Sequence, residues 1–237
     1  MGASPKRRII EYGLVLVVIA VLAAIILPTI GHTCGGMGGR RMADSSNLRQ
    51  IAQASLIYAQ DHQDRLPEAT DIWDYARILA ENRILEDGRM WQSRIDPASA
   101  EISQNKIEVL LPAETGRPRE LNPAFRKIKP AFAIPVGRRL NVAHPATTPI
   151  AWTRGLQPDG SWAKHSPYGT HGGHIVFLGG NVAFYLNLTD NGGELISRDG
   201  NKTANILDAL PAGCQISEYQ PTPEEQAQWS AQAAKSR

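Results

Sequence analysis

Three histidines lie close together in the chain, and imidazole is the commonest side-chain metal ligand in proteins. His165 precedes the glycine-rich stretch SPYGTHGGHIVFLGG, which contains His171 and His174. A metal site needs three or four ligands, and no cysteine or second carboxylate pair lies nearby at ligand spacing. The stretch therefore favours a structural loop that leads into a strand, and we expect no metal site here.

A second polar segment, TDNGGELISRDGN, carries the oxygen ligands that calcium prefers. Its carboxylate and amide side chains are Asp190, Asn191, Glu194, Asp199 and Asn201. Two turns of the Asn-Gly and Asp-Gly type account for the same composition without an ion. We therefore expect no cofactor, with calcium as the alternative.

Catalytic motifs are absent from the sequence. It contains no GxSxG, no HExxH, no phosphate-binding loop and no dinucleotide fingerprint. Serine, histidine and aspartate do not form a recognisable nucleophile motif. We therefore predict a protein that is not an enzyme.

Glu11 lies at the edge of an apolar run, where a carboxylate costs several kcal/mol unless it is paired or reaches the interface. The run YGLVLVVIAVLAAIILPTI occupies residues 12–30 and contains no charge. At 1.5 Å per residue it is about 28 Å long, close to the thickness of a hydrocarbon core. We predict a transmembrane helix over residues 9–30.

Basic residues indicate the orientation of this helix. Lys6, Arg7 and Arg8 precede it, and the next basic residue after it is Arg40. Because cytoplasmic flanks carry the positive excess, residues 1–8 are predicted to be a cytoplasmic leader. The rest of the chain then lies in the periplasm or another extracytoplasmic space. A cleavable secretory signal is the alternative.

The two cysteines, Cys34 and Cys214, lie far apart in the sequence. Outside the cytoplasm oxidation is permitted, and a disulfide between them would tie the segment next to the membrane to the end of the domain. Two unpaired or buried thiols are the alternative.

Net charge argues against a nucleic-acid partner. Of the 25 basic and 23 acidic side chains, Lys6, Arg7, Arg8 and Glu11 belong to the N-terminal segment. The remaining chain is nearly neutral, whereas a nucleic-acid binder must neutralise many phosphates.

The secondary structure after the membrane segment is predicted from the spacing of apolar residues and from the turn residues. Five glycines in residues 31–43 disfavour a helix, so we predict a flexible joint there. Asp44, Ser45 and Ser46 are predicted to cap a helix that ends near Asp61, and a second helix is predicted at 71–81. The buried face of the first helix is predicted to hold Leu48, Ile51, Ala52, Ser55, Leu56 and Ala59.

Strand-like segments dominate the second half of the chain. They occupy residues 131–136, 149–153, 175–178 and 182–186, and the last two flank a Gly179-Gly180-Asn181 hairpin signal. A helix that precedes an antiparallel sheet is an α+β arrangement. The polar tail at 221–237 is predicted either to form a solvent-exposed helix or to lack structure.

The N-terminal segment resembles the first helix of type IV pilins and pseudopilins. In that family a glutamate at the fifth mature position precedes an apolar stretch and a proline, as Glu11 and Pro28 do here. The resemblance implies that Glu11 pairs with the N-terminal amine of a neighbouring subunit. That amine is formed when the leader is cleaved off, and it is then N-methylated. Family leaders are cut after a small residue, where this chain has Lys6. A retained leader is therefore the alternative, with Arg7 or Arg8 pairing with Glu11 within one helix.

Two further segments carry the resemblance. The string NLRQIAQASLIYAQDHQDRLP is similar to the second half of the prepilin-type helix, through Asn47, Leu48, Gln50, Ile51, Tyr58, Asp61, Asp64 and Pro67. His171, Gly172, Gly173, Phe177 and the Gly179-Gly180 turn resemble a degenerate His-x9-Asp-Gly segment, in which Gly179 replaces the aspartate.

The sequence thus predicts a pilin-like α+β protein with an extracytoplasmic domain at 44–220, anchored in a bacterial inner membrane. By resemblance it is a pseudopilin-type subunit in protein transport, for a type II secretion system or a type IV pilus-like assembly. Its expected partners are membrane lipid and sister subunits or an assembly platform. The alternative is a stand-alone, membrane-tethered binding module that is neither processed nor assembled into a fibre.

Overall fold

A computed structural model describes residues 37–99, 106–113, 118–137 and 140–235 of the 237-residue chain. The apolar run at 12–30 lies outside these ranges. Within the described part of the chain, no helix combines the length and the apolar character needed to cross a membrane. Residues from Ala43 onward form one compact unit, and the packing described below is that of this unit.

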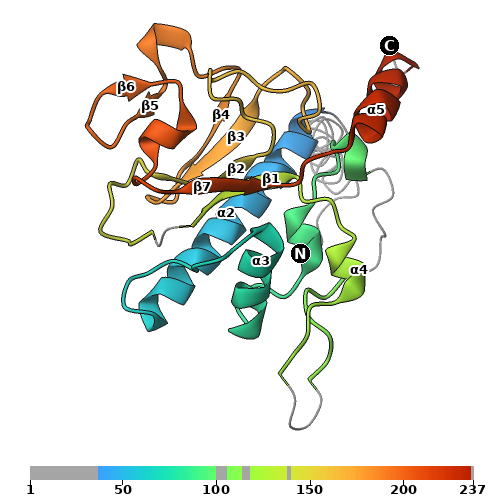
Figure 1. Ribbon diagram of the computed structural model, residues 1–237, viewed down its shortest axis with the longest axis vertical. Coiled ribbons are helices and arrows are strands. Elements are labelled where there is room, and N and C mark those ends of the chain that lie inside the picture. Colours follow the sequence, from blue (N-terminus) through green and yellow to red (C-terminus); the bar gives the residue numbers. More distant parts are fainter. Residues whose placement is uncertain (1–36, 100–105, 114–117, 138–139, 236–237) are drawn as a thin grey trace, which may run out of the picture. The chain divides into compact units, whose positions relative to one another are not determined.

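The fold is α+β, with a long helix packed against a five-stranded antiparallel sheet (Figure 1). The strands have the spatial order β4-β3-β2-β1-β7. Their bounds are β1 Phe132–Val136, β2 Pro149–Thr153, β3 Gly173–Phe177, β4 Val182–Tyr185 and β7 Gln215–Glu218. A small second sheet pairs β5 Leu195–Ile196 with β6 Lys202–Thr203.

The helices of the described chain are α2 Met37–Asp61, α3 Ile72–Glu81, α4 Pro123–Arg126 and α5 Pro223–Lys235. Short 3₁₀ turns are η1 Gly88–Trp91, η2 Pro97–Ser99, η3 Asp190–Gly192 and η4 Ile206–Ala209. The second helix was predicted correctly, and its N-cap Asp71 accepts a hydrogen bond from the backbone N–H of Asp74.

The start of α2 differs from the prediction. We predicted a flexible joint at 31–43 and a cap at Asp44, but the helix begins at Met37 and Asp44 lies inside it. Extending an existing helix adds one hydrogen bond per residue and needs no new nucleus, so a helix can include Gly38 and Gly39 despite their cost of about 1 kcal/mol each. The predicted end at Asp61 is confirmed.

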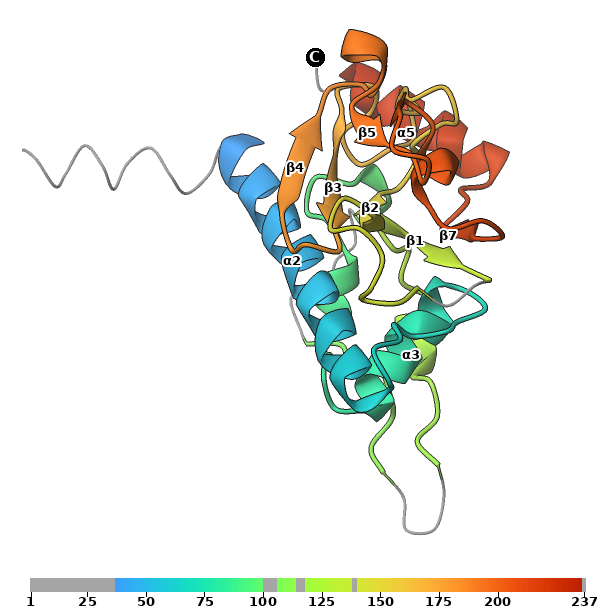
Figure 2. The same ribbon diagram turned by 90° about the vertical axis from the view of Figure 1, so that its left-hand side faces the viewer.

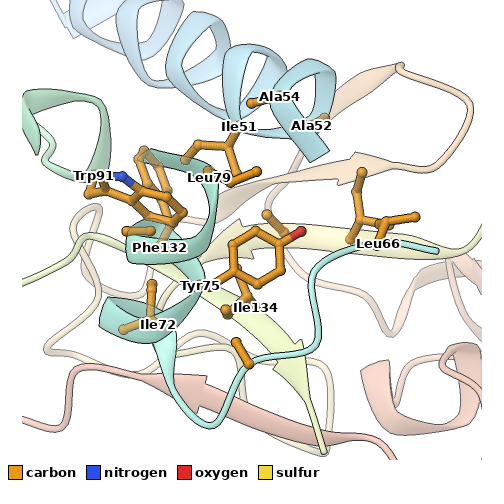
Figure 3. Close-up of a cluster of buried hydrophobic side chains, with 14 of the residues drawn as sticks. Ile51, Ala52, Ala54, Leu66, Ile72, Tyr75, Leu79, Trp91, Phe132 and Ile134 are labelled. Atoms are coloured by element: carbon orange, nitrogen blue, oxygen red, sulfur yellow. The ribbon is translucent and has the colours of Figure 1, made fainter. Parts of the chain in front are cut away.

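The buried face of α2 agrees with the predicted periodicity. Ile51 and Ala52 pack into the main core beside Trp91 and Phe132 (Figure 3). The buried residues of this face are Leu48, Ile51, Ala52, Ser55 and Ala59, and Leu56 is partly buried. Ser55 Oγ adds a polar contact, 2.7 Å from the hydroxyl of Tyr75 on α3.

The sheet separates two cores. In β1, Phe132 and Ile134 point to the core that contains α2 and α3, while Ala133 belongs to a second core. The second core also contains Leu195 and Ile206 from the region of β5 and η4. Figure 2 shows α2 on one side of the sheet and β5 on the other. Both faces are therefore covered, which explains why every residue of β1, β2 and β3 is buried.

Four strands and their hairpin were predicted, and three other strands were not. The β3–β4 hairpin turns at Gly179-Gly180, where Gly180 has φ +82°. The missed strand β7 is short and polar and pairs along β1 at the sheet edge. The missed β5 and β6 have two residues each. Such short segments show no usable alternation of apolar and polar residues.

The tail is a helix that is not solvent-exposed along its whole length. Of the two predicted alternatives the helix is correct, since α5 is exposed at most positions from 223 to 228. Trp229 is the exception, at 9% exposed. The polar composition of the tail concealed this because only one large apolar side chain holds the helix to the domain.

Candidate functional site

Most of the predicted site residues lie outside the part of the chain that the structure describes. Those that lie outside the described residues are Lys6, Arg7, Arg8, Glu11, Pro28 and Cys34. Cys214 lies just before β7, half-buried against the second core. Its pairing with Cys34 stays a prediction.

The segments with metal-ligand residues form a strand and turns. His174 is 5% exposed and belongs to β3 rather than to a loop. Asn191-Gly192 and Asp199-Gly200 form turns with positive φ at Asn191, Gly192 and Gly200, as the composition suggested. Across the described ranges, no group of three or more histidine, cysteine or acidic side chains is placed to hold a metal ion.

Several buried polar side chains are hydrogen-bonded around Asp44, and we call this group the Asp44 cluster. It comprises Asp44 on α2, Ser93 after η1, Tyr168 before β3, and His174. The hydroxyls of Ser93 and Tyr168 both donate to Asp44 Oδ2, at 2.5 and 2.7 Å. Tyr168 Oη also lies 3.3 Å from His174 Nδ1. The cluster therefore joins the helix to the sheet through side chains alone.

Aromatic contacts and one backbone bond fix the sheet end of this cluster. The ring of Phe184 on β4 meets those of His174 and Tyr168 edge-on, at centroid distances of 4.9 and 5.5 Å. The backbone N–H of His174 donates to Thr153 Oγ1 on β2. The imidazole is thus held by the Phe184 and Tyr168 side chains, and the backbone of His174 is held by Thr153.

Burial dominates the electrostatics of Asp44, which is 2% exposed. Loss of solvation raises its pKa from 3.8 to about 6, against the lowering effect of the hydrogen bonds from Ser93 and Tyr168. The nearby charge of Asp96 raises it further. Asp44 therefore changes protonation in the mildly acidic range.

A second cluster surrounds Arg154, directly after β2, and we call it the Arg154 cluster. Its guanidinium makes a bidentate pair with Asp96, with N–O distances of 2.5 and 2.7 Å, and both side chains are 0% exposed. It also donates to the carbonyl oxygens of Pro130 and His165. Burial raises the pKa of Asp96, and the charge of Arg154 opposes that rise. Because arginine stays protonated and bonds both carboxylate oxygens, we treat the pair as ionised at neutral pH.

The C-terminal helix covers the Arg154 cluster. The rings of Trp229 and Tyr219 lie 5.5 and 5.7 Å from the guanidinium carbon of Arg154, within cation–π range. Glu225 of α5 pairs with Lys129 at 2.6 Å and accepts from the Tyr219 hydroxyl at 2.5 Å. These two bonds lower the pKa of Glu225 to about 2, and the bond from Lys129 has the larger effect. The helix is thus held by charge as well as by its tryptophan.

The two clusters form one buried polar network. Asp96 follows Ser93 in a tight turn, in which its N–H donates to the Ser93 carbonyl. On the sheet, Thr153 and Arg154 are consecutive residues that serve the two clusters separately. The network thereby connects α2, the turn at 93–96, two strands and α5.

Most polar atoms of the network are paired, but Arg154 Nε is buried without a hydrogen-bond partner among the described residues. Two cavities of the described chain lie away from the network. One such cavity, near the end of α2, is lined by Tyr58, Asp61, His62, Gln63, Arg65, Leu66 and Glu68. Another lies between the loop at 144–148 and the region of β5 and η4. Ser93 Oγ donates to a carboxylate and is 1% exposed, unlike an activated nucleophile. The arrangement is suited to holding elements together.

Sequence reasoning identified only part of this network. It singled out His174, and it assigned Asp44 to a helix cap. Asp96 and Arg154 were missed because isolated charged residues in irregular sequence look solvent-exposed. The only available signal was an arginine immediately after the apolar strand PIAWT.

Comparison with known protein families, with curated proteins and with solved structures finds no match to this chain.

Replacing Asp44 with asparagine should change how stability depends on pH. The unfolded pKa of 3.8 lies below the folded value of about 6, so the folded state binds more protons between them and wild-type stability falls as pH rises. Asparagine keeps an acceptor oxygen and does not titrate. The free energy of unfolding of wild type minus that of Asp44→Asn should fall by roughly 2 kcal/mol from pH 4 to pH 8.

Denaturant unfolding of the full chain in mild detergent measures this difference, since all five tryptophans lie in the described domain. The exposed Asp61→Asn variant should retain the wild-type profile. Parallel profiles for wild type and Asp44→Asn would contradict the buried, titrating carboxylate.

Removing one partner of the buried ion pair should destabilise the domain strongly. Arg154→Met leaves Asp96 buried without a counter-charge, and we expect a loss of about 3–5 kcal/mol in unfolding free energy. The double variant Arg154→Met/Asp96→Leu removes both charges and should recover most of that loss. Arg89→Met, which breaks the exposed pair with Asp87, is the control and should cost much less. If Arg154→Met and Arg89→Met lost the same unfolding free energy, the pair between Arg154 and Asp96 would not be desolvated.

Proposed function

We propose that this chain is a non-enzymatic, membrane-anchored, pilin-like subunit of a type II secretion or type IV pilus-like assembly. It resides in a bacterial inner membrane, with residues 1–8 in the cytoplasm and the domain in the periplasm or another extracytoplasmic space. The observation that carries the proposal is the packing of the 25-residue helix α2 onto an antiparallel sheet, six residues after a 19-residue apolar run.

The buried face of α2 supports this assignment. In a pilin-like subunit the second half of the N-terminal helix packs on the sheet of its own domain, and here α2 is buried at Leu48, Ile51 and Ala52. Asp44 adds a polar attachment between the same helix and β3 through Tyr168 and His174. The helix is therefore held on the sheet by both apolar and polar contacts.

The outward face of α2 is also consistent with packing between subunits. Arg49, Gln50 and Gln53 are exposed, and Ile57 is 48% exposed although it is apolar. Met42 on the same helix is 75% exposed, and exposed apolar side chains can mark a protein contact surface. This face therefore has both polar and apolar side chains available for contact with a sister subunit.

The buried network supports a role without catalysis. The polar side chains of the Asp44 cluster and the ion pair of the Arg154 cluster are directed at one another. Their arrangement stabilises the domain and presents no reactive group to a substrate.

Replacing Glu11 tests the assembly role. In the proposal its carboxylate pairs with the N-terminal amine of a neighbouring subunit, since an unpaired charge at the membrane edge is unfavourable. Glu11→Ala should leave membrane insertion intact and reduce crosslinks between neighbouring subunits at least tenfold. Glu224→Ala, at an exposed position on α5, is the matched control and should crosslink like wild type. Unchanged crosslinking of Glu11→Ala would count against assembly through this carboxylate.

A second candidate is a membrane-tethered binding module that is never assembled into a fibre. It is favoured by Lys6, which stands where pilin leaders have a small residue before the cleavage point. Mass spectrometry of the native N-terminus separates the two candidates. A trimmed and N-methylated start at Arg7 is the result expected for a subunit, and an intact start upstream of Lys6 is that expected for a permanent tether.

A further inference from the structure

A cavity remote from the polar network offers a binding site. It has a volume of about 390 Å³, within the approximate 300–1,000 Å³ range of small-molecule sites. Its walls come from the loop before β2 and from the region of β5 and η4, which are about 50 residues apart in the chain. The residues that matter for recognition are His144, Thr147, Ile196, Arg198, Ala209 and Pro211.

Backbone hydrogen bonds hold both walls in place. The N–H of Gly179 in the β3–β4 turn donates to the carbonyl of Ala146, and that of Leu178 donates to Thr148. On the other wall, the N–H of Arg198 donates to the carbonyl of Asp208. The cavity is therefore preformed, which limits the entropy lost on binding.

The charge of the lining is one-sided. Arg198 and His144 contribute basic groups, and no described lining residue is acidic. Within the described part of the chain, Arg198 forms no ion pair, and its guanidinium makes one hydrogen bond, from Nη1 to the carbonyl of Leu210 at 3.3 Å. A guanidinium has five N–H donors in a fork that matches a carboxylate. The cavity thus presents an anion-binding group.

The rest of the lining is apolar or hydroxylated. Ile196 is 38% exposed although its neighbour Leu195 is buried, and Ala209 and Pro211 continue the apolar wall. The hydroxyls of Thr147 and Ser197 lie at the same site and suit a polar group next to the anion. These surfaces suit a short aliphatic group.

We propose that this cavity binds a carboxylate attached to a short aliphatic side chain, as in an apolar amino acid or at the C terminus of a peptide that ends in one. Arg198 binds the carboxylate, His144 lies beside it as a second polar group, and Ile196 with Pro211 contacts the aliphatic group. The site is formed by the domain alone and does not depend on the membrane role proposed above.

Calorimetry on the full chain in mild detergent tests the proposal with three probes: N-acetyl-leucine, N-acetyl-leucinamide and a tetrapeptide that ends in leucine. N-acetyl-leucine should bind saturably, and the amide, which lacks the charge, should bind at least tenfold more weakly. The tetrapeptide identifies the source, since affinity at least equal to that of N-acetyl-leucine indicates a peptide terminus and weaker affinity indicates a free small acid.

Variants identify the residues responsible. Arg198→Gln should weaken binding of N-acetyl-leucine at least tenfold, and Arg49→Gln, on the exposed face of α2, should leave it unchanged. Ile196→Ser should weaken N-acetyl-leucine but not acetate, because acetate has no aliphatic side chain. His144→Gln provides a second readout if Arg198→Gln alters tryptophan fluorescence, and it should also weaken binding of N-acetyl-leucine. Equal binding of acid and amide, or no saturable binding of any probe, would overturn the proposal.

Discussion

The buried ion pair between Arg154 and Asp96 is the constraint on which the arrangement of the domain depends. Two charges with no exposed surface are stable only when their geometry is good and their remaining donors are satisfied. The two Nη groups of Arg154 meet this requirement with two carboxylate contacts and two backbone carbonyls, and its face is covered by Trp229. Its Nε is the exception, buried without a hydrogen-bond partner among the described residues. Five segments far apart in the sequence must therefore converge at one point.

The same constraint reaches α2 through a single turn. The Ser93 hydroxyl donates a hydrogen bond to Asp44 on the helix. The carboxylate of Asp96, three residues later, accepts hydrogen bonds from Arg154. A rotation of α2 about its axis would move Asp44 away from two hydroxyl donors and would leave it buried without partners. Apolar contacts at Leu48 and Ile51 tolerate small slips more readily, so the polar contacts define the register of the helix on the sheet.

Local patterns accounted for much of the fold and little of the site. Strands such as Pro149–Thr153 were predictable because both faces of the sheet are covered and the segment is apolar throughout. The β3–β4 hairpin was predictable because glycine tolerates positive φ at its turn. Strand β7 was not, because its pairing with β1 over a separation of about 80 residues leaves no local signal. The start of α2 was misjudged because glycine content was given more weight than helix continuity.

The sequence by itself determined the apolar segment at 12–30 with Glu11 at its edge, the spacing of the buried face of α2, and the order of four strands. These features depend on residue type and on neighbours within one turn or one hairpin, so a single sequence contains them. Only the tertiary structure decided that Asp44, Asp96 and Arg154 are buried, that Trp229 covers the arginine, and that Arg198 and His144 line one cavity. Each of those facts depends on contacts between segments that the chain brings together only when it folds.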